Sequence, residues 1–457
     1  MARRLAAVAR EVDGELVGND AGFGPVGIDT RGLDAGALFV AIKGEHLDGN
    51  DFVADAHARG AAGALVSTLA SVPLPQVKVA DTRGAFGQMA RAWRANFAVP
   101  VVAVTGSNGK TTVKELIASI LTAKRRVCAT RGNLNNEIGV PLTLMELTAR
   151  HEVLVVELGA NHAGEIAYLS GLTQPTVGVI TNANAAHLEG FGSVAGVAAA
   201  KGELLDQLPR SGTAVINADD AFCGDWRARS RAATVLTFGL DASADCAAIG
   251  EIHAGPTGSR FEMRLPEGER VQVDLPLAGR HNVVNALAAA AAAYALGVSA
   301  PDIRAGLGSA HGVRGRLSVL PGRGGAAIID DSYNANPAST RAALDYLAGC
   351  GGRRILVLGD MAELGEDAPA LHREIGEYAR SRCDGLLAIG ELSRGAAETF
   401  GAQGRWFADV AALSQALELA LGEDTTILVK GSRVMALDQL VDLLRSVPGR
   451  DGEERAC

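Results

Sequence analysis

The sequence predicts an α/β protein with three domains. Its 457 residues exceed what one hydrophobic core usually supports, so roughly two to four domains are expected from length alone. From residue 99 onward, apolar strand-like runs alternate with helical patterns, as in a parallel sheet covered by helices. The alternation begins again near residue 325. We therefore place the domains at residues 1–96, 97–316 and 317–457.

The composition fits a globular protein. Hydrophobic residues make up 48% and charged residues 21% of the chain. No apolar run approaches the roughly 18 residues that cross a bilayer, and charges interrupt the opening MARRLAAVAREVDG too early for a secretory signal. We expect a cytoplasmic protein without a membrane span. The cysteines form no C-x-x-C pair and are expected to be reduced thiols: Cys128, Cys223, Cys246, Cys350, Cys383 and Cys457.

The charge of the chain argues against a nucleic-acid partner. The formal net charge is −9, and no run of lysines and arginines could follow a phosphate backbone. An anionic ligand must therefore be held locally, by glycine-rich turns and helix N-termini.

The first domain is predicted to be a small α/β unit. Short strand-like runs at 37–42 and 64–67 are separated by turn residues, and a helical pattern at 83–96 leads into the next domain.

The second domain is predicted to contain a parallel sheet. The strand PVVAVTG ends in a glycine turn, and the helix that follows is marked by apolar residues at helical spacing from Val113 to Leu121. Further strands are expected at 153–158, 176–181 and 213–217, and an alanine-rich helix follows Gly279.

The third domain is predicted to be of Rossmann type. The strand-like runs AAIIDD, RILVLGD, DGLLAIG and TTILVKG are each followed by a helical pattern, although no G-x-G-x-x-G dinucleotide motif is present.

The turn between the first strand and helix of the second domain is a candidate phosphate loop. Backbone N–H groups there can surround phosphate oxygens, Lys110 can neutralise terminal phosphates, and the Thr111 hydroxyl can bind Mg²⁺. Position 104 is Val where the Walker pattern has Gly, and the simpler alternative is a tight turn with an exposed lysine. The loop comprises Thr105, Gly106, Ser107, Asn108, Gly109, Lys110, Thr111 and Thr112.

Three further residues are candidates for the same edge of the sheet. Glu157 ends a predicted strand, where a carboxylate can bind Mg²⁺ or simply cap a turn. His187 follows the next strand and is a candidate metal or phosphate ligand, with a plain surface role as the alternative. Lys201, in AAAKGELL, reads by itself as a helix-surface lysine.

Two asparagines open the alanine-rich helix. Asn282 and Asn285 lie about one turn apart on one face, where they could contact an adenine edge or cap and pack the helix.

The ordered motifs resemble the Mur ligase family. They are TGSNGKTT, GNLNNEIGVPLTL, ELGANHAGEI, TNANAAHLEGFGS, AKGE, GRHNVVNALAA, DDSYNANP, GDMAELG and VKGSR, preceded by DTRGLDAGALFVAIKGEHLDGNDF. Each motif is moderately specific alone, whereas the ordered set is highly specific and spans nearly the whole chain.

The resemblance implies ATP-dependent ligation of D-alanyl-D-alanine to UDP-N-acetylmuramoyl-tripeptide. The implied route is an acyl phosphate, and the product is the pentapeptide precursor of peptidoglycan, with release of ADP and phosphate. The run SYNANP and the lack of a D-N-P-R motif favour this activity over addition of the third amino acid. ATP and Mg²⁺ are the implied cofactors, and we expect a monomer acting on small molecules. Whether the third peptide residue is lysine or diaminopimelate stays open, as does the general base.

The resemblance also assigns roles to residues. The first domain would bind the UDP end through Thr30, Arg31 and Lys43, and Asn135 and Asn136 would lie near metal and substrate. Lys201 matches a lysine that several members carry as a carbamate, which would bind a second Mg²⁺ beside Glu157 and His187. With Lys110, these three are the implied catalytic residues.

The third domain would add contacts from the opposite side. Arg316 and Asp331 match positions that reach ATP after domain closure, and Tyr333, Asn334 and Asn336 are implied substrate contacts. Lys430 and Arg433 are candidates for an anionic contact or for a packing role.

Three other functions are possible for a chain with this phosphate loop, and each differs from the ligase in one respect. A ligase that acts on folate, as folylpolyglutamate synthetase does, would not need the N-terminal DTR region. A nucleotide-gated switch would release phosphate without an amine acceptor. A pure binding module would not need the full set of Lys110, Thr111, Glu157 and His187.

Overall fold

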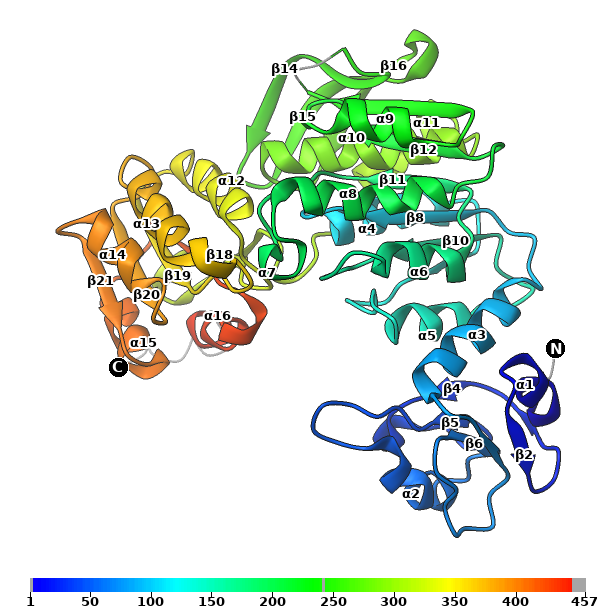
Figure 1. Ribbon diagram of the computed structural model, residues 1–457. Coiled ribbons are helices and arrows are strands. Elements are labelled where there is room, and N and C mark those ends of the chain that lie inside the picture. The colour runs from blue at the N-terminus through cyan, green and yellow to red at the C-terminus, as the bar shows by residue number, and fades with distance from the viewer. Residues whose placement is uncertain (1–2, 241–242, 446–457) are drawn as a thin grey trace, which may run out of the picture.

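The computed structural model describes residues 3–240 and 243–445. Three consecutive parts of the chain each form a sheet of their own, which confirms the predicted α/β class, and the central domain lies between the other two (Figure 1). Five cysteines are free thiols, and Cys457 lies outside the described residues. In the described ranges, no helix combines the length and the hydropathy needed to span a membrane.

The N-terminal domain contains a five-stranded sheet in the order β2-β7-β6-β5-β4, of which only β2 is antiparallel to its neighbour. Strands β5 and β6 confirm the two strand-like runs. Its elements are β1 (Arg3–Arg4), α1 (Leu5–Glu11), β2 (Glu15–Val17), β3 (Gly22–Phe23), β4 (Val26–Gly27), β5 (Leu38–Val40), α2 (Val53–Ala58), β6 (Gly63–Val66) and β7 (Gln76–Lys78). Helix α3 (Thr82–Arg94), expected at 83–96, then packs against α5 (Gly139–Met145) and α6 (Glu165–Thr173) of the central domain.

The central domain contains a nine-stranded sheet in the order β16-β15-β14-β13-β12-β11-β8-β10-β9. From β14 to β9 in this spatial order, which includes β8, all neighbouring strands are parallel. Strands β14, β15 and β16 form an antiparallel ribbon that the sequence patterns do not indicate. The strands are β8 (Val101–Thr105), β9 (Val127–Ala129), β10 (Val153–Glu157), β11 (Val177–Ile180), β12 (Thr213–Asn217), β13 (Thr234–Gly239), β14 (Cys246–Gly255), β15 (Gly258–Arg264) and β16 (Arg270–Leu275).

Helices cover both faces of this sheet, so its central strands are buried on both sides. Val102 and Val104 of β8 belong to the core under α4, α10 and α11, whereas Val101 and Ala103 belong to the opposite core under α5, α6 and α8. The helices are α4 (Lys110–Thr122), α5 (Gly139–Met145), α6 (Glu165–Thr173), α7 (Leu188–Phe191), α8 (Val194–Asp206), α9 (Cys223–Arg229), α10 (Arg280–Ala295) and α11 (Ala300–Gly308).

The C-terminal domain has the predicted doubly wound form. Its six-stranded sheet has the order β17-β18-β22-β19-β20-β21 and is parallel except for the edge strand β17. The strands are β17 (Ser318–Pro321), β18 (Ala327–Asp331), β19 (Arg353–Gly359), β20 (Gly385–Ile389), β21 (Gly404–Phe407) and β22 (Thr425–Lys430). The helices are α12 (Pro337–Ala348), α13 (Ala368–Ala379), α14 (Arg394–Phe400), α15 (Val410–Glu418) and α16 (Asp438–Leu444).

The central and C-terminal domains touch through α12 and α7. The turn between β14 and β15 meets α12, where the Tyr346 hydroxyl donates a hydrogen bond to the Pro256 carbonyl at 2.8 Å. Helix α7 lies beside the 3₁₀ turn Gly365–Asp367 of the C-terminal domain (Figure 1). These contacts bring C-terminal residues to the edge of the central sheet where the candidate phosphate loop lies.

Candidate active site

The candidate phosphate loop joins β8 to α4 and requires glycine at two positions. Gly106 and Gly109 have φ values of 144° and 81°, which disfavour side chains with a Cβ. A Cβ on Gly106 would collide with Oγ1 of Thr181, and one on Gly109 would collide with Oδ1 of Asn285. The loop therefore packs directly on its neighbours.

The loop is held by the segment that follows β11. The Ser107 N–H donates to the Asn182 carbonyl at 2.9 Å, and the Asn108 N–H donates to Oδ1 of Asn182 at the same distance. The Thr181 hydroxyl donates to the Asn108 carbonyl at 2.6 Å. Asn182 lies in the motif TNANAAHLEGFGS, but no local pattern distinguishes it as a residue that holds the loop.

Lys110 folds back over the loop. Its Nζ donates to the carbonyls of Gly106 at 2.8 Å and Ser107 at 3.2 Å. Burial lowers the pKa of Lys110, the charge of Glu157 opposes that shift, and the charge of Arg316 adds to it. The alternative of a freely exposed lysine does not fit this half-buried, doubly bonded side chain.

Glu157 is almost completely buried at the end of β10, with 1% of its surface exposed. Its Oε1 accepts a hydrogen bond from Nδ2 of Asn135 at 2.7 Å, whereas Oε2 has no hydrogen-bond partner among the described residues. A buried carboxylate oxygen without a partner is costly, so this atom fits a cation. Asn136 instead shapes the loop, because its Oδ1 accepts from the Gly139 N–H at 2.9 Å.

Mg²⁺ fits this donor set when a nucleotide supplies further oxygens. The described residues contain no group of three His, Cys, Asp or Glu side chains that could hold a metal by themselves. Mg²⁺ is usually bound by one or two carboxylates together with substrate phosphates. Glu157 and the Thr111 hydroxyl are the residues suited to that role.

Lys201 is not the surface lysine that its helix pattern suggested. It is 1% exposed, and its Nζ donates to the Ala160 carbonyl at 3.3 Å and lies 5.2 Å from the centre of the Phe191 ring. Burial, followed by the charge of Lys110, lowers the pKa of Lys201 to about 7. The amine is therefore largely neutral in weakly alkaline solution. Only the pattern-based reading is wrong, because AAAKGELL does not reveal which face of α8 is covered.

His187 reaches the C-terminal domain. Its Nδ1 lies 2.5 Å from Oε2 of Glu363, and its side chain is 22% exposed. In the described ranges, no hydrogen bond or ion pair joins His187 to Glu157 or Lys201. The structure thus places the three implied metal ligands in one region without direct contact, and Glu363 is a partner that the sequence analysis missed.

Two residues from the domain boundary and the C-terminal domain touch the phosphate loop. Nη2 of Arg316 donates to Oγ1 of Thr111 at 3.3 Å, and its guanidinium lies 4.2 Å from the centre of the Tyr333 ring. Nδ2 of Asn336 donates to Oδ1 of Asn108 at 2.7 Å. Asn336, implied as a substrate contact, is thus also a contact between domains.

Asp331 and Lys430 form a buried ion pair. Nζ of Lys430 lies 2.5 Å from Oδ2 of Asp331 and also donates to the Asn334 carbonyl at 3.0 Å. Lys430 is therefore engaged in packing, which favours that role over a free anionic contact. Arg433 pairs with Asp438 at 3.2 Å, and the Tyr333 ring lies beside it.

The two asparagines of α10 are buried behind the loop. Nδ2 of Asn282 donates to the Ala278 carbonyl at 2.7 Å, and Nδ2 of Asn285 donates to Oδ1 of Asn282 at 3.0 Å. These bonds correspond to the packing alternative, and they place Asn285 against Gly109. Asn282 and Arg316 also line a narrow cavity beside α4, so contact with adenine stays a prediction.

The implied UDP contacts lie in the N-terminal domain. Thr30 is buried in the 3₁₀ turn Thr30–Gly32, whereas Arg31 is 88% exposed and pairs with Asp29 at 2.6 Å, which lowers the pKa of Asp29 to about 2. The Lys43 carbonyl accepts from Nη2 of Arg83 at 3.1 Å, and Nη1 of Arg83 pairs with Glu137 at 3.2 Å. Arg83, not anticipated from the sequence, thus connects the Lys43 loop to the NLNNE segment.

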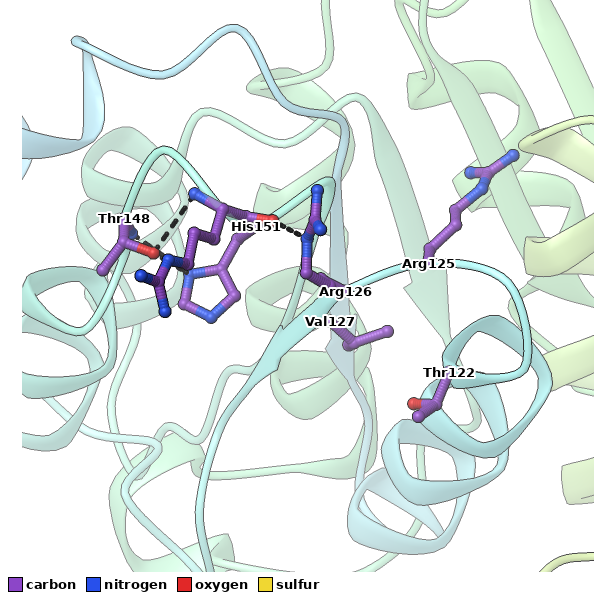
Figure 2. A pocket seen from close by; sticks show the side chains of 7 residues that line it. Thr122, Arg125, Arg126, Val127, Thr148 and His151 are labelled. Atoms are coloured by element: carbon purple, nitrogen blue, oxygen red, sulfur yellow. Dashed lines mark hydrogen bonds between the residues drawn. The ribbon is translucent and has the colours of Figure 1, made fainter.

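A larger cavity lies away from these residues. It has a volume of about 590 Å³ and sits where α4 ends and β9 begins, at the opposite end of α4 from the phosphate loop (Figure 2). Nε of Arg126 donates to the Arg150 carbonyl at 2.5 Å within it. Its lining residues are Thr122, Arg125, Arg126, Val127, Thr148, Arg150 and His151. None of them was a candidate site residue.

Comparison with known families gives matches over most of the chain. Residues 24–94 match the description "Mur ligase family, catalytic domain", residues 104–293 match "Mur ligase middle domain", and residues 315–433 match "Mur ligase, glutamate ligase domain". The chain is 45% identical over 444 residues to the UDP-N-acetylmuramoyl-tripeptide--D-alanyl-D-alanine ligase of Escherichia coli (strain K12). This alignment covers 96% of the chain and 98% of that relative.

Solved structures show the same arrangement. A crystal structure of MurF from Acinetobacter baumannii matches with a TM-score of 0.90 and 36% identity, over 97% of this chain and 99% of that one. A structure of MurF ligase from Thermotoga maritima in complex with ADP matches with a TM-score of 0.80 and 27% identity, over 92% and 96% of the two chains.

Proposed function

The chain belongs to the Mur ligase family, and we propose that it uses ATP to join D-alanyl-D-alanine to UDP-N-acetylmuramoyl-tripeptide. It is an ATP-dependent amide-forming ligase of peptidoglycan synthesis. The observation that carries the proposal is the phosphate loop, which is held by Asn182. Arg316 contacts the loop from the boundary between the central and C-terminal domains, and Asn336 contacts it from the C-terminal domain.

The first chemical step activates the tripeptide acid. A carboxylate is a poor electrophile, so a terminal carboxylate oxygen takes the γ-phosphoryl group of ATP. The bond between the γ-phosphorus and the oxygen of the β-phosphate breaks, ADP leaves with its electron pair, and an acyl phosphate remains. Loop N–H groups other than those that donate to Asn182, together with Lys110, would stabilise the charge on the transferring group, chiefly by position and electrostatics. Thr111 and Glu157 would hold Mg²⁺, which would neutralise the phosphate oxygens.

The second step forms the amide. The free amine of D-alanyl-D-alanine attacks the acyl carbon, the tetrahedral species collapses, and inorganic phosphate leaves with the electron pair of the broken C–O bond. Water would destroy the acyl phosphate, so the intermediate must be covered. Arg316 at the domain boundary, together with Tyr333 and Asn336 of the C-terminal domain, would supply that cover.

Lys201 is proposed to act as a carbamate. Its pKa of about 7 leaves a neutral amine, which can attack the carbon of CO₂. An N–C bond forms, one C=O electron pair moves to oxygen, and the lost proton goes to solvent. The resulting anion would hold a second Mg²⁺ near Glu157 and His187.

The three domains divide the substrates. With boundaries after residues 96 and 316, the N-terminal domain would bind UDP through Thr30, Arg31 and Lys43, the central domain ATP, and the C-terminal domain the amine. Asn282, Asn285 and Asp331 would complete the ATP site. Asn135, Asn136, Tyr333 and Asn334 would contact substrate. We also propose that the enzyme works as a monomer in the cytoplasm, where ATP is available.

The test is product analysis by mass spectrometry. The enzyme is incubated with ATP, Mg²⁺, UDP-N-acetylmuramoyl-tripeptide and D-alanyl-D-alanine, and the pentapeptide product is expected. Phosphate release should require both the UDP-peptide and the dipeptide. Release without the dipeptide would favour a nucleotide-gated switch, and a product formed only with a folate and glutamate would favour the folate ligase.

A further inference from the structure

Glu363 and His187 meet across the interface between the C-terminal and central domains. Oε2 of Glu363 lies 2.5 Å from Nδ1 of His187, and the Glu189 N–H donates to the Glu363 carbonyl at 3.4 Å. Side-chain and backbone contacts thus fix the same point. The GDMAELG segment that carries Glu363 has no role in the two chemical steps described above.

Both residues have an unusual backbone conformation. Glu363 has φ of 62° and His187 has φ of 54°, in the left-handed region that non-glycine residues rarely occupy. Such conformations persist only where the surroundings enforce them, and they cluster at functional sites. The two strained residues face each other, which indicates that their contact is more than incidental packing.

The geometry suits a histidine that binds a metal. A metal-binding imidazole uses one ring nitrogen, while its other N–H is usually held by a carboxylate that fixes the ring and the tautomer. Glu363 approaches Nδ1, which leaves Nε2 for a cation. Nδ1 is buried and its approach to the carboxylate is short but not aligned as a hydrogen bond, so a rotation of the ring is needed to complete it.

We propose that Glu363 is a positioning residue, brought by the C-terminal domain, which keeps the proton of His187 on Nδ1 and prepares Nε2 to bind the cation beside the nucleotide. The inference rests on the proposed function. His187 follows β11, at the same edge of the parallel sheet as the phosphate loop and Glu157.

If Glu363 positions His187, cation binding is coupled to the packing of the C-terminal domain against the central domain. Glu363 reaches His187 only when the C-terminal domain lies against the central domain. By thermodynamic linkage, a cation bound to His187 must then stabilise this domain contact by the same factor by which the contact raises the affinity for the cation. A merely structural ion pair would have no such effect, and a pair exposed by 22% and 46% adds little stability.

Cation binding without turnover tests the proposal. Binding of Mn²⁺ to the full-length enzyme with a nonhydrolysable ATP analogue is measured by electron paramagnetic resonance. Glu363→Ala is expected to weaken Mn²⁺ binding by about 10- to 100-fold, with an unchanged melting temperature. Glu363→Gln should lie closer to wild type, because its amide oxygen can still accept from the Nδ1–H. The matched control Glu366→Gln, an exposed glutamate three residues along, should match wild type.

The histidine ring gives a second readout. Nitrogen-15 chemical shifts, assigned with His187→Gln, should report a proton on Nδ1 in wild type and on Nε2 in Glu363→Ala. Wild-type Mn²⁺ affinity and an unchanged tautomer in Glu363→Ala would overturn the inference, as would equal losses in the alanine and glutamine variants. If wild-type enzyme itself showed no cation-dependent nucleotide binding, the proposed function would fail with it.

Discussion

Asn336 donates a hydrogen bond from Nδ2 to Oδ1 of Asn108, a phosphate-loop residue 228 positions earlier in the chain, at 2.7 Å. The Oδ1 of the same side chain accepts from the Ser339 N–H at 2.9 Å and caps helix α12. One asparagine therefore both begins a helix of the C-terminal domain and links that domain to the phosphate loop.

The two roles of Asn336 can be separated by substitution. Asn336→Asp keeps an oxygen to cap α12 but loses the donor to Asn108 and places a negative charge near the phosphates. We expect an unchanged melting temperature and at least a tenfold loss of kcat/KM for ATP, because losing about 1.4 kcal/mol corresponds to tenfold. Asn336→Ala should lose activity and about 1 kcal/mol of stability through the missing cap. Full activity of the aspartate variant would contradict the proposed link.

Lys110 is predicted to act in phosphoryl transfer more than in folding. Lys110→Ala should lower kcat by about 100-fold or more, since electrostatic donors of this kind contribute roughly 3 kcal/mol to the transition state. Its thermal unfolding should stay close to wild type. Lys114→Ala is not a suitable control because Lys114 is fully buried, so exposed Lys124→Ala serves instead. A full turnover rate in Lys110→Ala would place the active site elsewhere.

Glu157 is predicted to lower the stability of the metal-free enzyme, because its buried carboxylate is arranged to bind a cation. Its Oε2 is buried without a hydrogen-bond partner in the described structure, so the neutral Glu157→Gln should remove the desolvation cost of a charge that Lys110 and Asn135 offset only in part. We expect the metal-free variant to unfold at a higher temperature, by on the order of 1 kcal/mol of added stability, and to lose nearly all activity. Calorimetry in EDTA measures the first effect. A variant less stable than wild type in EDTA would show that the orphaned oxygen is satisfied in solution.

Lys201 is predicted to make the free energy of unfolding increase with pH. Its folded-state pKa is lowered to about 7, below the ordinary value of 10.5, so the unfolded chain binds more protons between these values. The free energy of unfolding should therefore rise with pH from about 7 to about 10. Below pH 7 the cost of the buried charge is fully present.

The comparison variant is Lys201→Met, which removes the amine and keeps the volume. The difference in unfolding free energy between wild type and Lys201→Met should change across pH 7 to 10 in CO₂-free buffer. A constant difference would show that the amine is not perturbed. With ¹³C-labelled bicarbonate, a carbamate signal should appear in wild type and be missing from Lys201→Met.

Local features of the site could be predicted from the sequence. The strand before the phosphate loop and the helix after it both follow from short apolar patterns, and the structure has them at Val101–Thr105 and Lys110–Thr122. Glu157 could be placed at a strand end for the same reason. Parallel pairing then brings these ends to one edge of the sheet.

Features that depend on distant packing could not be predicted. The side chain of Lys201 is buried against Phe191 and Ala160, and the side chains of Asn108 and His187 each have a partner from another domain. No local pattern identifies such partners. The ribbon β14–β16 was missed because its strands are half polar and sit at the edge of the sheet, where burial is one-sided.

The hydrogen bond between Tyr346 and Pro256 ties α12 of the C-terminal domain to the ribbon β14–β16 at one point, about which the helix can tilt. Tyr346 and Asn336 lie on one rigid helix, separated by about 15 Å at 1.5 Å per residue. A tilt of α12 by roughly 10° about Tyr346 therefore displaces Asn336 by roughly 3 Å. Such a tilt is enough to break the hydrogen bond between Asn336 and Asn108 while the hydrogen bond between Tyr346 and Pro256 stays intact.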